Sequence, residues 1–485
     1  MSDQEQADFV RSRASRAFGW SFGNTLAGRL GTLLIGITLA RVLGPEEFGI
    51  FAIATVALLA VLSFNELGVS LAVIRWREDP ALTAPTINTI AVTSSALLTG
   101  AMIVAAPWIS AGLGDPAATP VVQVIALSVL INGLVATPAA ILQREFLQRQ
   151  RTIADQVNTW LGAGLSLLLA LLGWGAMSLA IGRLVASLVF AVMIWRWSPV
   201  PYRFGWDRAV VGRLLRFGLP LAASSIVVFA SGYVDQIIVG SMLGAQALGF
   251  YVLAFNLASW PVSIFSLPLR AVAPAAFSAL KHDPPRMSRN FFRVLTVLSC
   301  VALPTCLAIS GAADAVVGFV YGSPWLPAGE ILMWMAAVAA LRIWFELAYD
   351  YLVVQGRSAV VLLIQTCSFA VSLPVTLAVV GPYGQSGVAA VQLFVAVVVV
   401  LPLYVWNLVR VQLPARSLLA AVALPVAAGV LVWCACWAVT AWIDAAFVAS
   451  LVSAAIAAAA IGLLAFWQRG NLRLLRQAFA GKGQS

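Results

Sequence analysis

Apolar segments long enough to cross a membrane recur along the whole chain, and they constrain its fold more than any other feature. About 20 helical residues span a lipid hydrocarbon core, and backbone polar groups there must be satisfied within the segment. A β-barrel would show alternating segments of about ten residues instead. The apolar segments predict spans at residues 18–40, 48–74, 86–108, 120–142, 153–172, 174–196, 214–241, 247–270, 291–312, 329–354, 358–380, 386–409, 417–442 and 445–467. We therefore expect an all-α integral membrane protein of about fourteen transmembrane helices.

The basic residues fall on alternate loops between these spans. Of the 29 lysines and arginines, all but four lie on one side of the predicted membrane, and Arg41 is the exception among the loops. The remaining three, Arg29, Arg183 and Arg342, lie within spans. Because basic residues accumulate on the cytoplasmic side, this alternation predicts that both termini are cytoplasmic. The net charge of +10 follows from the same loops, so it does not indicate nucleic-acid binding.

Residues suited to metal binding or nucleophilic catalysis are few and scattered. The five cysteines all lie inside predicted spans, and the single histidine, His282, lies in a predicted loop. This pattern fits neither a metal site nor a catalytic centre. The sequence therefore predicts no catalytic residues, no metal and no cofactor.

A weak internal repeat divides the chain into lobes. Leu43-Gly44, Gly49 and Ala54 recur 200 residues later as Leu243-Gly244, Gly249 and Ala254, and Gly114-Asp115-Pro116 resembles Gly322-Ser323-Pro324. Both copies run in the same direction, which indicates two parallel-repeat six-helix lobes, a known transporter arrangement. We expect an N-terminal lobe at 1–200 (helices 1–6) and a C-terminal lobe at 201–412 (helices 7–12). Helices 13–14 and a cytoplasmic tail are expected at 413–485.

Short motifs in a fixed order resemble one transporter family. They are Leu39-Ala40-Arg41, Phe48-Gly49, Phe64-Asn65-Glu66-Leu67-Gly68, Leu215-Arg216-Phe217-Gly218, Gly249-Phe250-Tyr251, Leu253-Ala254-Phe255-Asn256, Pro274-Ala275-Ala276-Phe277 and Val320-Tyr321-Gly322-Ser323-Pro324-Trp325. Over residues 15–410 the chain resembles the polysaccharide transport (oligosaccharide flippase) family of the multidrug/oligosaccharidyl-lipid/polysaccharide exporter superfamily. Within that family it looks most like the colanic-acid-exporter branch.

The resemblance implies a two-lobed exporter in the bacterial cytoplasmic (inner) membrane that works by alternating access. Its substrate would be an undecaprenyl-diphosphate-linked oligosaccharide, moved outward for polysaccharide biosynthesis. Membrane lipids would be further partners, as would a polysaccharide polymerase and export machinery. A diphosphate and its sugars cannot cross a hydrocarbon core unaided, because burying such polar groups is too costly.

Six ionisable residues lie well inside predicted spans and are candidates for function: Arg29, Glu66, Arg183, Asp235, Arg342 and Glu346. Charged residues within a membrane usually face a bundle interior or a cavity. A guanidinium can bind phosphate through two parallel hydrogen bonds, so Arg29 and Arg183 are predicted to bind the diphosphate. Salt bridges between helices, for instance from Arg29 to Glu66 or Asp235, are the alternative.

The two isolated carboxylates and the remaining pair have other interpretations. Glu66 and Asp235 are candidates either for ion coupling or for salt-bridge partners of an arginine. Arg342 and Glu346 are four residues apart on one helix, which favours a structural intrahelical pair that lowers the cost of burying both.

Three other functions remain open from the residues. A lipid II flippase and a cation-coupled drug exporter belong to the same superfamily, although twelve spans would be expected for the drug exporters. A membrane glycan polymerase or ligase would carry a long external loop with catalytic residues. The longest predicted external loop, about 313–328, offers only Asp314.

Overall fold

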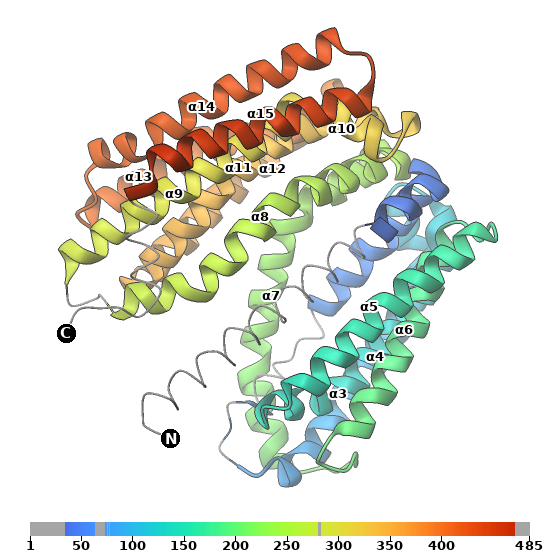
Figure 1. The fold of residues 1–485 in the computed structure, drawn as a ribbon. Helices are drawn as coiled ribbons and strands as arrows, with labels where there is room; N and C mark the ends of the chain where they lie inside the picture. The colour runs from blue at the N-terminus through green and yellow to red at the C-terminus, as the bar shows by residue number, and fades with distance from the viewer. Residues whose placement is uncertain (1–33, 64–72, 75, 77, 280–282, 471–485) are drawn as a thin grey trace, which may run out of the picture. The chain divides into compact units, whose positions relative to one another are not determined.

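The fold was obtained as a computed structural model, which describes residues 34–63, 73, 74, 76, 78–279 and 283–470. The chain divides into two compact units, residues 1–230 and 231–485. The boundary between them in the sequence falls within helix α7 (Arg208–Leu243). The predicted lobe limits at 200 and 412 stay predictions. Every regular element in the described part of the chain is helical (Figure 1), in agreement with the predicted all-α fold.

The first unit contains the helical stretch Leu34–Ser63, α3 (Pro80–Gly112), η1 (Pro116–Ala118), α4 (Thr119–Arg144), α5 (Gln148–Leu171), α6 (Ala176–Trp197) and the first part of α7. Within it, α3 packs on α4, α5 packs on α6, and α6 also contacts α4. Two buried apolar clusters hold these pairs together. One joins α3 and α4 to Val210 and Leu214 at the beginning of α7, and the other joins α4, α5 and α6.

The second unit contains the rest of α7, α8 (Ala245–Ala279), α9 (Pro284–Gly311), α10 (Ala313–Val320), η2 (Ser323–Trp325), α11 (Pro327–Val354), α12 (Ser358–Val395), the π-helical segment η3 (Ala396–Val400), α13 (Leu401–Arg410), α14 (Ala415–Trp442) and α15 (Ala446–Trp467). Helix α11 packs on α8, α9 and α12. Helices α14 and α15, the two predicted additions, pack on α9 and on each other. Close packing of α14 depends on Gly311, because a Cβ there would lie 2.6 Å from the Trp433 carbonyl oxygen.

Eleven helical stretches of the described residues are long and apolar enough to cross a membrane. Three features relate them to the fourteen predicted spans. Ser358–Arg410 holds two predicted spans, since Gly384, with φ 60° and ψ −155°, interrupts α12. Gly44, with φ 75°, likewise interrupts Leu34–Ser63. Helix α5 matches the span predicted at 153–172, but its polar first half keeps it out of the eleven.

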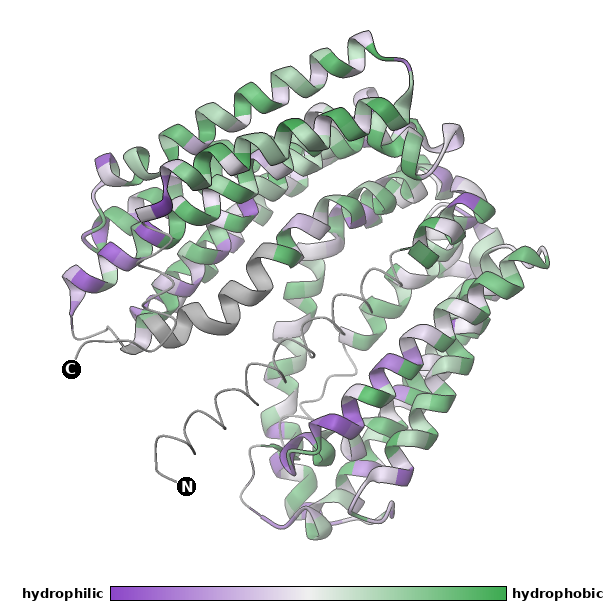
Figure 2. Cartoon of the chain, in the orientation of Figure 1, coloured by the Kyte–Doolittle hydropathy of each residue, from purple (hydrophilic) through white to green (hydrophobic). Residues whose placement is uncertain are grey.

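Hydropathy along the helices agrees with a membrane environment. In Figure 2 the hydrophobic colour runs along α14 and α15, whereas hydrophilic residues gather at the beginnings of α5 and α9. Many large apolar side chains are also solvent-exposed in both units, for example Leu97, Leu431 and Trp467. Apolar side chains on the outside of a helical bundle are the expected lipid-facing surface.

The repeat is visible in the backbone as well as in the sequence. Residues with positive φ recur at similar offsets in the two units: Gly44 and Gly244, Gly114 and Gly322, Phe146 and Gly356. The second pair matches the predicted echo, and each of its members comes shortly before a 3-10 helix, η1 or η2. A left-handed residue ends a helix and reverses the chain, and glycine adopts it without steric cost.

Asp-Pro dipeptides begin several helices and so fix where the chain enters the bundle. The Asp79 side chain accepts a hydrogen bond of 2.9 Å from the Ala81 amide at the beginning of α3. Asp115 does the same for η1 at 2.8 Å, and Asp283 for α9 at 3.1 Å. In each case proline occupies the next position, where its missing N–H costs nothing.

Candidate functional site

A cavity of about 610 Å³ lies inside the first unit, and its lining is polar on several sides. It is bordered by α3, α4, α5 and α6, with Leu58, Leu62 and Leu221 from the flanking helices. The polar side chains that line it are those of Ser95, Ser128, Asn132, Gln143, Arg151, Asn158, Arg183 and Ser187. Two of them are arginines, and no carboxylate is found among the described residues of the lining. The cavity is therefore suited to anions rather than cations.

Arg183 is the deeper of the two arginines. It lies on α6, seven residues after the helix begins and thirteen before Arg196, and its side chain is half-buried. Its guanidinium makes no hydrogen bond or ion pair with any residue that the structure describes. A charge in the middle of a span costs roughly 2.5–3.5 kcal/mol on insertion scales, so it calls for water or an anion in the cavity.

Small residues fix the direction in which Arg183 points. A Cβ on Gly182 would lie 2.1 Å from the Ser166 Oγ and 2.9 Å from the Gly162 carbonyl oxygen, so α6 touches α5 directly at this residue. Close approach through small residues is the usual way in which transmembrane helices associate. Gly182 faces α5, and successive residues of a helix point about 100° apart. The next residue, Arg183, therefore points to one side of this contact, where it lines the cavity.

A second glycine contact orients the amide side chain of Asn132 on α4. A Cβ on Gly133 would lie 2.1 Å from the Ser95 Oγ and 2.7 Å from the Ala91 carbonyl oxygen, so α4 touches α3 at that point. The adjacent residue, Asn132, lines the cavity. Glycine contacts thus orient a polar side chain on each of two helices.

Arg151 lies at the other end of the cavity, three residues after α5 begins. Its guanidinium donates a hydrogen bond to the Gln143 side-chain oxygen near the end of α4. Between the two arginines stand neutral hydrogen-bonding groups, Asn158 on α5 and Ser187 on α6. The Ser187 hydroxyl donates 2.8 Å to the Arg183 carbonyl oxygen, while the buried Ser128 Oγ has no partner among the described residues.

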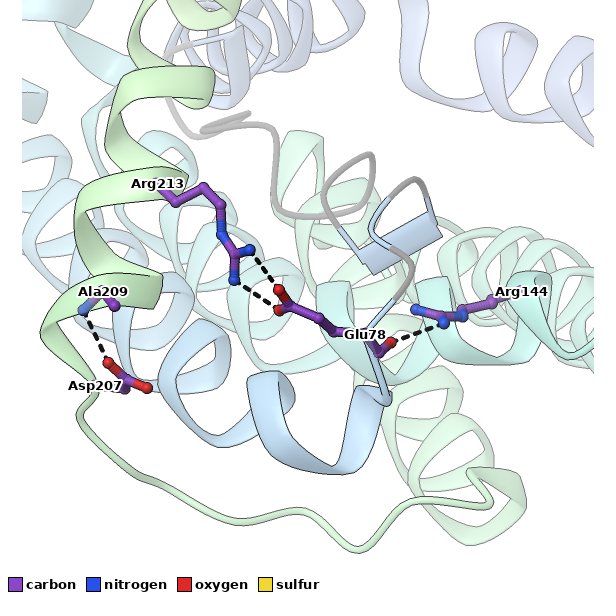
Figure 3. A network of polar contacts seen from close by, with 5 residues as sticks. All are labelled: Glu78, Arg144, Asp207, Ala209 and Arg213. Carbon is purple, nitrogen blue, oxygen red and sulfur yellow. Dashed lines mark hydrogen bonds and ion pairs between the residues drawn. The ribbon is translucent and has the colours of Figure 1, made fainter.

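A charged network joins three segments at the end of the first unit that carries Arg151, here called the basic end (Figure 3). Arg213 of α7 donates two hydrogen bonds to the Glu78 carboxylate, at 2.5 and 2.6 Å, and lies 4.2 Å above the Trp76 ring. Arg144 of α4 donates to the Glu78 carbonyl oxygen at 2.8 Å. Hydrogen bonding from Arg213 lowers the pKa of Glu78 below its ordinary value. The network fastens α7 to the loop before α3 and to the end of α4.

A carboxylate fastens the opposite end of the first unit. The Glu47 side chain accepts 2.6 Å from the Ala176 amide, the first of α6, which lies 129 residues later in the chain. Gly175 leaves room for it, because a Cβ there would lie 2.5 Å from the carboxylate. Negative charge at a helix N-terminus is favourable, so Glu47 caps α6 from another helix.

The remaining predicted site residues lie elsewhere. Arg29 and Glu66 fall outside the described residues. Asp235, in the second unit, is buried, and its carboxylate accepts 2.6 Å from the Tyr251 hydroxyl and 3.0 Å from the Gln236 amide. Its partner in the structure is therefore a tyrosine.

The predicted intrahelical pair also lies in the second unit, on α11. The Arg342 Nε is 3.7 Å from the Glu346 Oε1, and the arginine side chain is half exposed.

Sequence reasoning missed Arg151, Asn132 and Asn158. Arg151 counted only as a basic residue flanking a span. Its signal was the polar face of α5, where Arg151, Asp155 and Asn158 recur at helical spacing within an otherwise apolar hairpin.

The family model described as "Polysaccharide biosynthesis protein" matches residues 38–330, more than half of the chain. The chain belongs to this family. Among curated relatives, the lipopolysaccharide biosynthesis protein WzxC of Escherichia coli (strain K12) is 23% identical over 64% of this chain and 64% of its own. The succinoglycan biosynthesis transport protein ExoT of Rhizobium meliloti (strain 1021) is 24% identical over 71% and 70%.

Solved structures show a related fold. A lipid II flippase MurJ in an inward closed conformation superposes with a TM-score of 0.72, at 14% identity, over 94% of this chain and 100% of its own. An inward-facing multidrug resistance MATE family transporter of the MOP superfamily gives a TM-score of 0.62, at 14% identity, over 79% and 94%. The family match and the fold confirm the predicted family and the predicted class, an all-helical membrane protein of the polysaccharide biosynthesis family.

Proposed function

We propose that this protein moves an undecaprenyl-diphosphate-linked oligosaccharide from the cytoplasmic to the outer leaflet of the bacterial cytoplasmic membrane by alternating access. The observation that carries the proposal is the cavity of the first unit, where Arg183 is half-buried with no described partner. A diphosphate satisfies such a guanidinium with two charge-assisted hydrogen bonds. The polyprenyl tail remains in lipid while the polar headgroup uses the cavity.

The lining of the cavity also supports a glycan headgroup. Amide and hydroxyl side chains of Asn132, Asn158 and Ser187 accompany the arginines. Such groups both donate and accept hydrogen bonds, as sugar hydroxyls require. A drug exporter for organic cations would need carboxylates or aromatic faces at this place. The described lining contains a single aromatic side chain, Phe190, and no acid.

Both termini are proposed to be cytoplasmic, which places the basic end of the first unit on the cytoplasmic side. The proposal rests on the alternation of basic loops. The ends of α4 and α6 and the beginning of α5 carry Arg144, Arg196 and Arg149. The cavity then has one arginine near the leaflet in which a lipid-linked glycan is assembled.

Reconstitution tests the proposed transport. Purified protein in vesicles should expose a labelled undecaprenyl-diphosphate oligosaccharide to an outside probe without cleaving it. Arg183→Ala should abolish this exposure, and Arg183→Lys should recover only part of it, because lysine lacks the planar fork. Arg196→Ala serves as the matched control, since Arg196 is an exposed arginine of the same helix outside the cavity. Normal transport by Arg183→Ala would end the proposal for this site.

A deletion strain tests the biological role. Glycan assembly on the lipid carrier should continue, lipid-linked oligosaccharide should accumulate facing the cytoplasm, and surface polysaccharide should fall. Normal translocation of a shortened glycan would instead indicate a polymerase. Accumulation of lipid II alone would indicate a flippase for the peptidoglycan precursor.

A further inference from the structure

The two arginines of the cavity stand at different depths in the first unit. Arg151 lies three residues from the beginning of α5 at the basic end, or about 5 Å along the helix. Arg183 lies fourteen residues from Trp197, where α6 ends at the same basic end, or about 20 Å along that helix. The two guanidinium-bearing positions are thus separated by about 15 Å in depth. A diphosphate is much shorter than this separation, so the two arginines are best described as two positions along the cavity.

The side chain of Arg151 is held in place without being neutralised. Its described hydrogen-bond partner is the neutral amide oxygen of Gln143, which uses one of the five N–H donors of the guanidinium. Asp155, one turn further along α5, is exposed and attracts Arg151 electrostatically, but the two make no ion pair within the described part of the chain. The positive charge and most of the donors therefore remain available to the cavity.

From these observations we propose that Arg151, held by Gln143, forms a second phosphate-binding position at the basic end of the cavity, here called the mouth, separate from the deep position at Arg183. The inference rests on the proposed transport of a lipid diphosphate. The mouth position takes the headgroup first, and the headgroup then passes Asn158 and Ser187 to reach Arg183. Asn158 lies seven residues beyond Arg151, about 10 Å deeper.

The chain offers a pair of substitutions at Gln143 with opposite effects on Arg151. Gln143→Glu puts a carboxylate where the amide oxygen now accepts, and this neutralises Arg151 in place. Gln143→Ala removes the acceptor and leaves the charge free. Arg149→Ala removes an exposed arginine two residues away and controls for the general loss of positive charge at this end of α5.

The test measures the initial transport rate in vesicles against the membrane mole fraction of labelled undecaprenyl-diphosphate oligosaccharide. Arg151→Ala and Gln143→Glu should raise the half-saturating mole fraction roughly 10- to 100-fold, as expected for the loss of a charge-assisted hydrogen bond. Their maximal rates should stay near wild type. Gln143→Ala keeps the charge but loses the group that holds the guanidinium, so it should raise the half-saturating mole fraction less than Gln143→Glu does. Arg149→Ala should resemble wild type, whereas Arg183→Ala should lose maximal rate.

Two comparisons make the outcome decisive. If Arg151→Ala saturates like Arg149→Ala while Arg183→Ala is inactive, the mouth position is refuted and the proposed function stands. If Arg183→Ala is active, the proposed function itself fails at this site. Repeating the series in vesicles with and without phosphatidylglycerol distinguishes the source of the phosphate. A defect of Arg151→Ala that requires phosphatidylglycerol assigns the position to a phospholipid headgroup rather than to the substrate.

Discussion

At the scale of single residues, the charges of this chain differ in how they are neutralised. Glu78 is bound by Arg213, Glu346 lies near Arg342, and Asp235 accepts from Tyr251. Arg183 has no such described partner, although it lies deep in the first unit. A structural role accounts for a charge that is paired. An arginine held against a cavity by close helix packing, and left open to it, is better explained by an anionic ligand.

The Glu78–Arg213 contact should make the basic end of the first unit sensitive to acid. Because its pKa is lowered, the Glu78 carboxylate stabilises the fold above its ordinary pKa of 4.5 and loses that contribution as the pH falls through the folded value. We expect hydrogen exchange around residues 78–90 to accelerate as the pH falls below the pKa of Glu78 in the folded protein. In Glu78→Gln it should be fast already at neutral pH, with little further change on acidification.

Glu145→Gln is the control for Glu78, since Glu145 is an exposed carboxylate near the same end. Equal acid sensitivity of the wild type and Glu78→Gln would show that the ion pair does not hold this end together.

At the scale of helices, two glycine contacts bring together the helices that line the cavity. Gly182 lets α6 touch α5, and Gly133 lets α4 touch α3, each beside a cavity-lining polar residue. Such contacts were within reach of sequence reasoning only in part. The small residues Gly162, Ser166, Gly182 and Ala186 have the spacing of a packing motif, but a sequence does not tell which small residue meets which helix.

A methyl group at Gly182 should therefore separate α5 from α6. Gly182→Ala places a Cβ 2.1 Å from the Ser166 Oγ and 2.8 Å from the Ser166 amide nitrogen, so the helices must shift. We expect a loss of roughly 1–3 kcal/mol in stability, as for overpacked cores, together with reduced transport because Arg183 moves. Thermal unfolding in detergent and the vesicle assay measure the two effects.

Gly164→Ala is the matched control for Gly182, because a Cβ at Gly164 meets nothing within 4 Å. If both variants unfold at the same temperature, the contact between α5 and α6 at Gly182 is not tight.

At the scale of the whole molecule, the spans and their order were predictable because they depend on local composition. Apolar segments of sufficient length predict helices wherever they occur, and Gly44 and Gly244 mark the same turn in both halves of the repeat. The site was predicted less completely. Arg183 stands out as a charge in an apolar run, whereas Arg151 differs from the other basic residues beside a span only by its place on the polar face of α5. Its place on the cavity wall depends on tertiary packing.

Cysteine labelling tests the proposed orientation. In a cysteine-free background, Ala117→Cys and Gln246→Cys should react with an impermeant reagent in intact cells. Gln148→Cys and Asp283→Cys should react only after permeabilisation, because basic loops stay in the cytoplasm. The cysteine-free chain with no introduced cysteine provides the background signal. Labelling of Gln148→Cys from outside would reverse the proposed side of the cavity mouth.

The bond from the Ala176 amide to Glu47 has a consequence for biogenesis. During synthesis the ribosome must make 129 further residues after Glu47 before its partner exists. Until then the Glu47 carboxylate has no α6 amide to accept from, and it stays hydrated at the membrane surface. Contacts between distant residues form slowly, since the intervening chain must first be ordered. The first unit can therefore reach its final packing only after α6 has left the insertion machinery.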